Sequence, residues 1–238
     1  MMPRPEETGI MTEKKIEVVV PAEDEVFDIE LEEDLLEANR KIAEENRSIL
    51  DRFGIKAVDV MGSIGSGKTA LIERLVELLR DRYKIAMFGG DVTTTIDAER
   101  VSRHGAKVIQ INTGKECHLD ANLVRKALEK LKLEEINLLF IENVGNLICP
   151  AEFPLGAHKR VVVISVTEGP YTPLKHPYIF MEADVVVINK IDLAEVMGID
   201  LDKLEKDVKK VTPDSIIVRT SCRTGEGVER VAEALGLI

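Results

Sequence analysis

The sequence predicts an α/β fold with a mostly parallel sheet and helices on both of its faces. From residue 55 onward, short runs rich in Val, Ile and Leu alternate with segments whose apolar residues recur at helical spacing. Runs that stay apolar at consecutive positions suit strands buried on both faces, and helical crossovers join parallel strands. A glycine-rich loop follows the first run and opens a helix, which predicts a P-loop NTPase fold.

The composition of the 238-residue chain fits a globular protein, with 45% hydrophobic and 32% charged residues. Aromatic residues make up 4% and Trp is absent, so the core must be aliphatic. No run approaches the roughly 18 apolar residues that span a bilayer, and the N-terminus lacks the apolar segment of a secretory signal. We therefore expect a cytoplasmic protein that does not enter a membrane. Three cysteines do not indicate a disulfide framework.

The charge is concentrated near the N-terminus. The net charge is −11, and residues 1–50 hold 15 acidic but only 6 basic residues. This balance argues against a nucleic-acid partner, which would require a basic patch. We expect an acidic N-terminal leader and helix over residues 1–54 and a single domain over residues 55–238, which the motifs below predict to be a GTPase domain.

The leader begins with a polar stretch over residues 1–15, followed by a short strand candidate at Ile16–Val20 that Pro21 ends. The spacing of apolar residues then predicts a helix from about Leu31 to Phe53, which Gly54 terminates. This acidic helix is expected to pack weakly or to lie on the surface. It is either a solvated leader or an arm that docks a partner.

The remaining elements alternate regularly. Strands are expected at Ala57–Met61, Ile85–Phe88, Lys107–Ile111, Asn137–Ile141, Arg160–Val166, Asp184–Ile188 and Ser215–Val218. Helices are expected between them, among them Lys68–Leu79, Ala121–Leu131 and Leu201–Val211.

The loop after the first strand matches the pattern G-x-x-x-x-G-K-[ST] completely and stands between a strand and a helix. Its glycines let backbone N–H groups wrap phosphates at the N-terminus of the helix. Lys68 is expected to reach the β- and γ-phosphates, and the Thr69 hydroxyl to bind Mg²⁺. The predicted nucleotide contacts are Gly62, Ser63, Gly65, Ser66, Gly67, Lys68, Thr69 and Ala70.

A second motif, N-K-x-D, follows the strand near residue 188. The Asp192 carboxylate can accept hydrogen bonds from guanine N1–H and N2–H₂, which adenine cannot supply, so the motif predicts GTP and GDP as ligands. Asn189 would tie this loop to the phosphate loop, and Lys190 would lie across the base. The next strand ends in Ser221, Cys222 and Arg223, which we expect to support the base. Cys222 is expected to pack against this pocket rather than to bind a metal.

Two acidic residues end strands on the expected nucleotide edge of the sheet. Glu142, with Gly145 three residues later, suits a Mg²⁺ carboxylate and a γ-phosphate contact. Asp91 ends another strand, so Asp91, Glu142 or both are expected to reach Mg²⁺, and Thr93–Thr95 to contribute to a switch. Lys68, Thr69, Asp91 and Glu142 are the candidate catalytic residues; no general base is evident.

Cys117, His118 and Cys149 follow two strands on that same edge. A thiolate–imidazole–thiolate set suits Zn²⁺ or Ni²⁺. One subunit supplies only three ligands, whereas two copies at a two-fold axis would supply six. Spacing alone leaves open the alternative of two buried thiols and a surface histidine.

Together, the segments GSIGSGKT, GGDVTTTIDAERV, NTGKECHLDA, ENVGNLICPAEFPLG, VISVTEGPYTPLKHP and NKIDL resemble the HypB family of hydrogenase nickel-incorporation GTPases, which are SIMIBI-class P-loop proteins. The resemblance covers about residues 35–238. The related urease accessory GTPases carry Cys-Pro-His where this chain has Ala151 after Cys149 and Pro150, which disfavours that relative.

The resemblance implies a GTP-hydrolysing metallochaperone that delivers nickel to [NiFe] hydrogenase. It implies a GTP-dependent homodimer with a Ni²⁺ or Zn²⁺ site built from Cys117, His118 and Cys149, a HypA-type nickel chaperone as partner and the hydrogenase large-subunit precursor as recipient. Residues 1–50 contain neither Cys nor His, so the N-terminal nickel sites of some family members are not expected here.

Two other functions fit parts of the pattern. The chain could be a regulatory GTPase with structural cysteines, or a P-loop kinase acting on a small metabolite. The N-K-x-D loop argues against the kinase.

Overall fold

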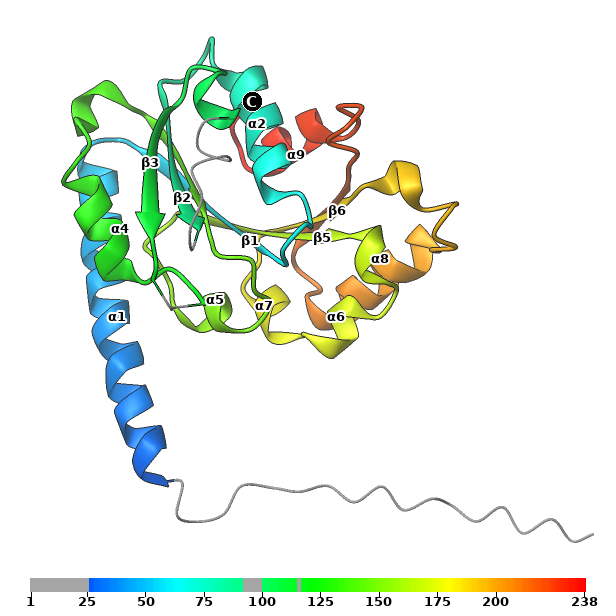
Figure 1. The fold of residues 1–238 in the computed structure, drawn as a ribbon, viewed down its shortest axis with the longest axis horizontal. Coiled ribbons are helices and arrows are strands. Elements are labelled where there is room, and N and C mark those ends of the chain that lie inside the picture. Colours follow the sequence, from blue (N-terminus) through cyan, green and yellow to red (C-terminus); the bar gives the residue numbers. More distant parts are fainter. Residues whose placement is uncertain (1–25, 92–99, 115–116) are drawn as a thin grey trace, which may run out of the picture.

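The computed structural model describes residues 26–91, 100–114 and 117–238, with the side chains of 26–32 and of Asp91 outside the description. In these ranges seven strands form one sheet in the order β3-β2-β4-β1-β5-β6-β7 (Figure 1). Every neighbouring pair is parallel. The strands are β1 (Lys56–Gly62), β2 (Ile85–Asp91), β3 (Lys107–Asn112), β4 (Leu138–Glu142), β5 (Lys159–Ser165), β6 (Val185–Asn189) and β7 (Ile216–Arg219). The predicted α/β class is confirmed.

The helices also follow the predicted pattern, and α2 (Lys68–Leu79) and α8 (Leu201–Val211) have the predicted bounds. Other helices in the described residues include α1 (Val26–Arg52), α4 (Ala121–Leu128), α5 (Cys149–Glu152), α6 (Thr172–Lys175), α7 (Tyr178–Met181) and α9 (Val228–Ala234), with 3-10 turns η2 (Leu133–Glu135), η3 (Val166–Glu168) and η4 (Ile191–Leu193). The strand candidate Ile16–Val20 and the switch residues Thr93–Thr95 lie outside the described residues.

Helices cover both faces of the sheet. On one face, α2 and α9 bury aliphatic side chains such as Leu75 and Val231 against β1 and its neighbours (Figure 1). On the other face, α1 and α4 cover β2, β3 and β4, while α7 and α8 cover β5 and β6. As the composition predicts, most of the fully buried side chains are aliphatic, with Phe88, Phe140 and Phe180 among the largest.

The expectation that α1 packs weakly is wrong for its C-terminal half. Ala43 is 4% exposed and Leu50 is fully buried, and the helix lies against α4. The N-terminal half projects past the sheet (Figure 1). The prediction failed because two of the buried positions on this face are polar, so the apolar spacing looked loose.

The described part of the chain contains no helix with the length and apolar character that crossing a membrane requires.

Candidate nucleotide and metal sites

The phosphate loop runs from the end of β1 at Gly62 to the start of α2 at Lys68. Backbone N–H groups at such a helix N-terminus face an anion. The Lys68 ammonium folds back over the loop and donates to the carbonyl oxygens of Gly62 at 3.1 Å and Ser63 at 3.0 Å. It is therefore already positioned where phosphate oxygens of a nucleotide can take the place of these carbonyls.

Thr69 and Glu142 form the candidate Mg²⁺ site. Adjacent pairing of β1 and β4 brings their ends together, and the Thr69 hydroxyl donates to Glu142 Oε1 at 2.7 Å. A cavity of about 360 Å³ opens beside them, lined also by Gly89, Gly90 and Asn143. A hydroxyl and a carboxylate with room for water suit Mg²⁺, which prefers oxygen ligands and keeps several waters. Asp91 ends the neighbouring β2, but its side chain lies outside the description.

Asn189 connects the base loop to the phosphate loop. It stands at the end of β6, and its Nδ2 donates to the Ser66 carbonyl at 2.9 Å. Its Oδ1 accepts from Thr220 Oγ1 at 3.1 Å and from the Cys222 backbone at 3.2 Å. One buried amide thus holds three loops in register at the edge of the sheet.

The Asp192 carboxylate is held ready to accept hydrogen bonds. Ser221 Oγ donates to it at 2.6 Å, and Arg223 Nε lies 3.1 Å from its other oxygen. The hydrogen bond from Ser221 lowers the pKa of Asp192, and the nearby Arg223 adds to this effect. The carboxylate is therefore charged at neutral pH, as a guanine reader requires.

Lys190 adopts a left-handed backbone conformation with φ of 61°, which is uncommon for a residue other than glycine. Its ammonium donates to the Gly65 carbonyl at 2.6 Å. The side chain thus spans the space between the base loop and the phosphate loop, where a base would lie against it.

A cavity of about 690 Å³ lies between these loops. Its lining includes Gly67, Ala70, Arg74, Arg100, His104, Asn189, Lys190, Asp192, Cys222 and Arg223. Burial raises the pKa of Cys222 to about 11, and this thiol lines the cavity and is not among the clustered ligand atoms of Cys117, His118 and Cys149. Among the predicted contacts, Cys222 therefore belongs with the nucleotide cavity.

Cys117, His118 and Cys149 come together at the same edge of the sheet. Their ligand atoms all lie within 4.8 Å of one another, and the two sulfurs are 3.0 Å apart. Cys149 begins α5, whose first turn includes Pro150. The adjacent Cys117 thiol raises the pKa of Cys149, and partial burial acts in the same direction. At this separation the loss of a proton from both thiols is unfavourable, because the two negative charges would repel each other unless a cation binds between them.

The donor set fits a borderline-soft ion such as Zn²⁺ or Ni²⁺. Thiolates bound to tetrahedral zinc at about 2.3 Å lie about 3.8 Å apart, so the sulfurs would separate by under about 1 Å. His118 stacks on Phe153 with ring centroids 3.9 Å apart, which limits the orientations of the imidazole. Three ligands from one chain leave at least one coordination position for a further donor.

Asn143 is a site residue that the sequence reasoning missed. It follows Glu142 directly, is 1% exposed, and its Oδ1 accepts from the backbone of Leu119 at 3.1 Å and of Val144 at 3.0 Å. Its Nδ2 donates to Asp59 at 3.3 Å. It thereby joins the Mg²⁺ side of β4 to the residue after His118. Its position could have identified it, because it is a polar residue directly after the acidic residue that ends a buried strand.

Glu168, in the turn η3 after β5, was also missed. Its Oε1 accepts from the Ser165 backbone at 2.9 Å, and burial raises its pKa despite the nearby Lys190 and Lys68. It adds a partly buried carboxyl group beside the phosphate loop.

The fold and these loops define a P-loop nucleotide-binding protein with a cysteine–histidine cluster beside the nucleotide cavity. The model of the CobW/HypB/UreG nucleotide-binding domain matches residues 56–219. A probable hydrogenase maturation factor HypB from Methanocaldococcus jannaschii is 57% identical over 86% of this chain and 93% of its own length.

Solved structures of HypB proteins are also similar to this chain. HypB from Archaeoglobus fulgidus is 48% identical, with a TM-score of 0.79 over 84% of this chain and 97% of that one. HypB from Helicobacter pylori, crystallised in complex with nickel, is 36% identical with a TM-score of 0.79 over 83% of this chain and 93% of that one. The chain belongs to the HypB family of hydrogenase maturation factors.

Proposed function

We propose that this protein is a GTP-hydrolysing metallochaperone that delivers nickel during the maturation of [NiFe] hydrogenase. In this proposal it takes up metal at a GTP-dependent dimer interface and works with a HypA-type nickel chaperone on the hydrogenase large-subunit precursor. Membership of the HypB family supports the process, and the nickel complex of the Helicobacter pylori relative supports the metal. We place the activity in the cytoplasm, where thiols stay reduced.

The loop from Glu142 to Cys149 carries this proposal, because it links the two sites. A Cβ atom added to Gly145 would lie 2.3 Å from Ile64 Cγ1, so this glycine lets the loop pack directly on the phosphate loop. The backbone of Asn146 pairs with that of Gly62, and its side chain donates to the Cys117 carbonyl at 3.4 Å. A shift of the phosphate loop on GTP binding would therefore be transmitted to both thiols.

The chemistry of hydrolysis rests on charge neutralisation. Lys68 would balance charge on the β- and γ-phosphates, while Thr69 and Glu142 would hold Mg²⁺, which stabilises the charge that develops in phosphoryl transfer. No predicted site residue in the described part of the chain takes the role of a general base. We propose that the second subunit or a partner completes the site, so that the isolated subunit turns over slowly.

A dimer would complete the metal site. Each subunit offers three ligands, and two sets meeting at a two-fold axis would offer six. The segment over residues 171–181 exposes apolar side chains, with Tyr178 72% and Leu174 47% exposed. Ile179, in the same segment, is 1% exposed and belongs to the core. Leu174 and Tyr178 are therefore the better candidates for dimer contacts.

The test is a Ni²⁺ titration of the full chain with GDP and with a non-hydrolysable GTP analogue, with mass measured by light scattering. We expect a dimer and tighter metal binding with the analogue, by about 5–150-fold if the coupling is of ordinary size. By linkage, Ni²⁺ should tighten binding of the analogue by the same factor. Binding should weaken as the pH falls, because protons compete for the thiolates and the imidazole.

Cys149→Ala should lose the nucleotide-coupled metal and keep GTP binding, whereas Cys222→Ala, at a buried thiol outside the cluster, should keep the metal. Equal Ni²⁺ affinity with GDP and with the analogue would refute the delivery mechanism and favour a regulatory GTPase. Wild-type metal binding in both Cys117→Ala and Cys149→Ala would refute the metal site.

A further inference from the structure

One face of α1 buries amides where a helix packed on a protein core usually buries apolar side chains. Among the α1 side chains that the structure describes, from residue 33 onward, the buried ones are Asn39, Ala43, Asn46 and Leu50, exposed by 6%, 4%, 0% and 0%. Their spacing of four, three and four residues puts them on one stripe of the helix. Burial of an amide is unfavourable unless hydrogen bonds within the protein replace those to water. The hydrogen-bond partners of these two asparagines therefore show which parts of the protein this face of α1 holds.

Both asparagines bind the same two segments of backbone. Asn39 Nδ2 donates to the Pro154 carbonyl at 2.9 Å, and its Oδ1 accepts from the Ala121 N–H at 2.8 Å. Asn46 Nδ2 donates to the Ala121 carbonyl at 2.8 Å and to the Leu155 carbonyl at 3.2 Å. Each amide thus joins the start of α4 to the segment that follows α5.

These two segments carry the metal ligands. Ala121 is three residues after His118, and Pro154 is five residues after Cys149. Between Cys149 and Pro154 lies Phe153, whose ring stacks on the imidazole of His118 at 3.9 Å. The amides of α1 therefore fix the distance between the backbone that bears Cys117 and His118 and the backbone that bears Cys149.

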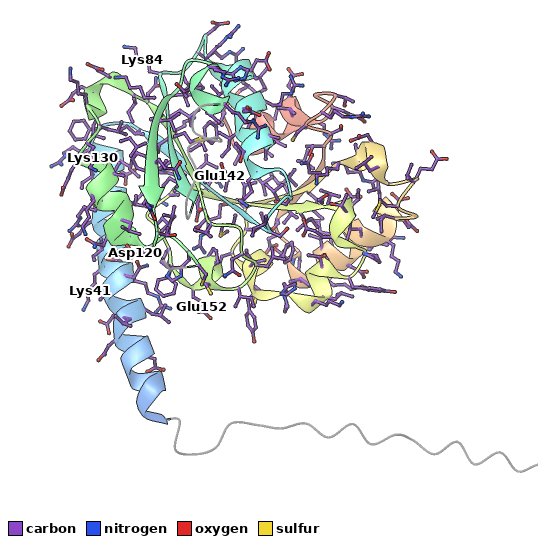
Figure 2. The ribbon with its side chains drawn as sticks, viewed as in Figure 1. Lys41, Lys84, Asp120, Lys130, Glu142 and Glu152 are labelled. Atoms are coloured by element: carbon purple, nitrogen blue, oxygen red, sulfur yellow. The ribbon has the colours of Figure 1, made fainter. Side chains whose placement is uncertain are left out.

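Neighbouring contacts hold α1 in this position. Arg47 Nε donates to the Gly156 carbonyl at 2.8 Å, and its guanidinium also binds the Ala157 carbonyl. Glu45 forms an ion pair with Arg125 of α4. A Cβ atom on Gly156 would lie 2.5 Å from the Ala43 carbonyl, so the helix and this segment touch at the backbone. Figure 2 shows Asp120, at the start of α4, and Glu152, at the end of α5, on the same side of the molecule as Lys41 of α1.

We propose that Asn39 and Asn46 are positioning residues for the Cys117–His118–Cys149 metal site, and that α1 is part of that site rather than a leader. The inference rests on the metal site of the proposed function. The asparagines do not touch the ion. They set the separation of the two loops and, through Pro154 and Phe153, the orientation of the His118 ring.

The experiment is a Ni²⁺ titration of the full chain with the GTP analogue bound. It follows the sulfur-to-metal charge-transfer absorption and is done at a temperature where circular dichroism shows every variant folded. Asn39→Ala and Asn46→Ala should each weaken Ni²⁺ binding by about tenfold, the lower end of the loss for groups that orient metal ligands, and should change the charge-transfer band. Binding of the GTP analogue should not change.

Asn137→Ala is the matched control. Its side chain also accepts one backbone hydrogen bond, from Lys84 at 2.8 Å, and Lys84 is labelled well above Asp120 in Figure 2. Asn137 is exposed, so this variant loses a side-chain–backbone hydrogen bond at the surface, and it should keep the wild-type affinity and band. If Asn39→Ala does not fold, the same titration is made with Asn39→Asp. It keeps the acceptor for Ala121 and loses the donor to Pro154, so it should weaken Ni²⁺ binding by several-fold.

Wild-type Ni²⁺ affinity, within twofold, and an unchanged band in the folded asparagine variants would overturn the inference and leave the metal site intact. Equal Ni²⁺ binding by the wild type and by both Cys117→Ala and Cys149→Ala would overturn the metal site and the inference together.

Discussion

Asp59 places a carboxyl group in the middle of the sheet, and we expect it to make the stability of the protein depend on pH. It lies on β1, is fully buried, and accepts one hydrogen bond, from Asn143 at 3.3 Å. Arg160 Nε is 3.8 Å from its other oxygen, too far for a hydrogen bond. Burial raises the pKa of Asp59 to about 6, although Arg160 and Asn143 act in the opposite direction.

The sign follows from the direction of this pKa change. An ordinary aspartate in the unfolded chain titrates near 3.8, so between that pH and about 6 the folded state holds a proton that the unfolded state has lost. The stabilising contribution of protonated Asp59 is complete below about pH 4 and is lost as the pH rises through about 6. A pKa difference of this size corresponds to about 3 kcal/mol of unfolding free energy.

Asp59→Asn keeps the shape of the side chain and removes its titration. We expect the free energy of unfolding of the variant, relative to wild type, to rise by about 2.5 kcal/mol between pH 4 and pH 7.5. The measurement is urea unfolding across this range without nucleotide or metal. Glu182→Gln removes the exposed partner of the same Arg160 and should give a profile parallel to wild type. Parallel profiles for Asp59→Asn and wild type would refute the argument that the buried charge is costly.

Three further predictions concern function. Asp192→Asn should weaken GTP binding by about 2–4 kcal/mol, because a guanine donor then faces an amide donor, and xanthosine triphosphate should bind this variant better than GTP does; equal GTP affinity in wild type and variant would contradict the base assignment. Lys68→Ala should abolish hydrolysis measured by phosphate release, since charge on the γ-phosphate is no longer neutralised; residual wild-type turnover would exclude Lys68 from the reaction. Leu174→Ala should reduce the dimer with the GTP analogue without blocking nucleotide binding, and light scattering that shows the same mass as wild type would remove Leu174 from the interface.

The sheet was predictable because its signals are local. Every predicted strand from residue 55 onward is present, and most bounds differ by one residue, since apolar runs between turn signals report burial directly. The phosphate loop was predictable for the same reason, as strand, glycines and helix are contiguous in the sequence. The main difference in a strand bound is that β2 runs past Phe88 to Asp91, the residue that was expected to end a strand.

The roles of Asn39 and Asn46 were not predictable from the sequence, and for Asn143 the only signal was its position directly after Glu142. From the sequence, an asparagine in a helix is expected to lie on the surface unless its backbone hydrogen-bond partners are known. The partners of Asn39 lie 82 and 115 residues away in the sequence. Ile179 shows a related limit, because a short apolar segment does not reveal which of its side chains face the core. The strand endings did indicate that the cysteines and His118 share one edge, but not that their ligand atoms lie within 4.8 Å.

The order of strands in the sheet has a consequence for synthesis on the ribosome. β1 lies between β4 and β5, so Lys56 pairs with Leu138 and Val58 with Lys159. A nascent chain that has reached β3 can join β2 to β3, but it contains neither neighbour of β1. The phosphate loop therefore has no framework until β4 and β5 have left the exit tunnel. The ability to hold a nucleotide arises later still, because Asn189 and Asp192 follow β5 in the sequence, and a chain that stalls before β4 exposes an unpaired central strand to aggregation.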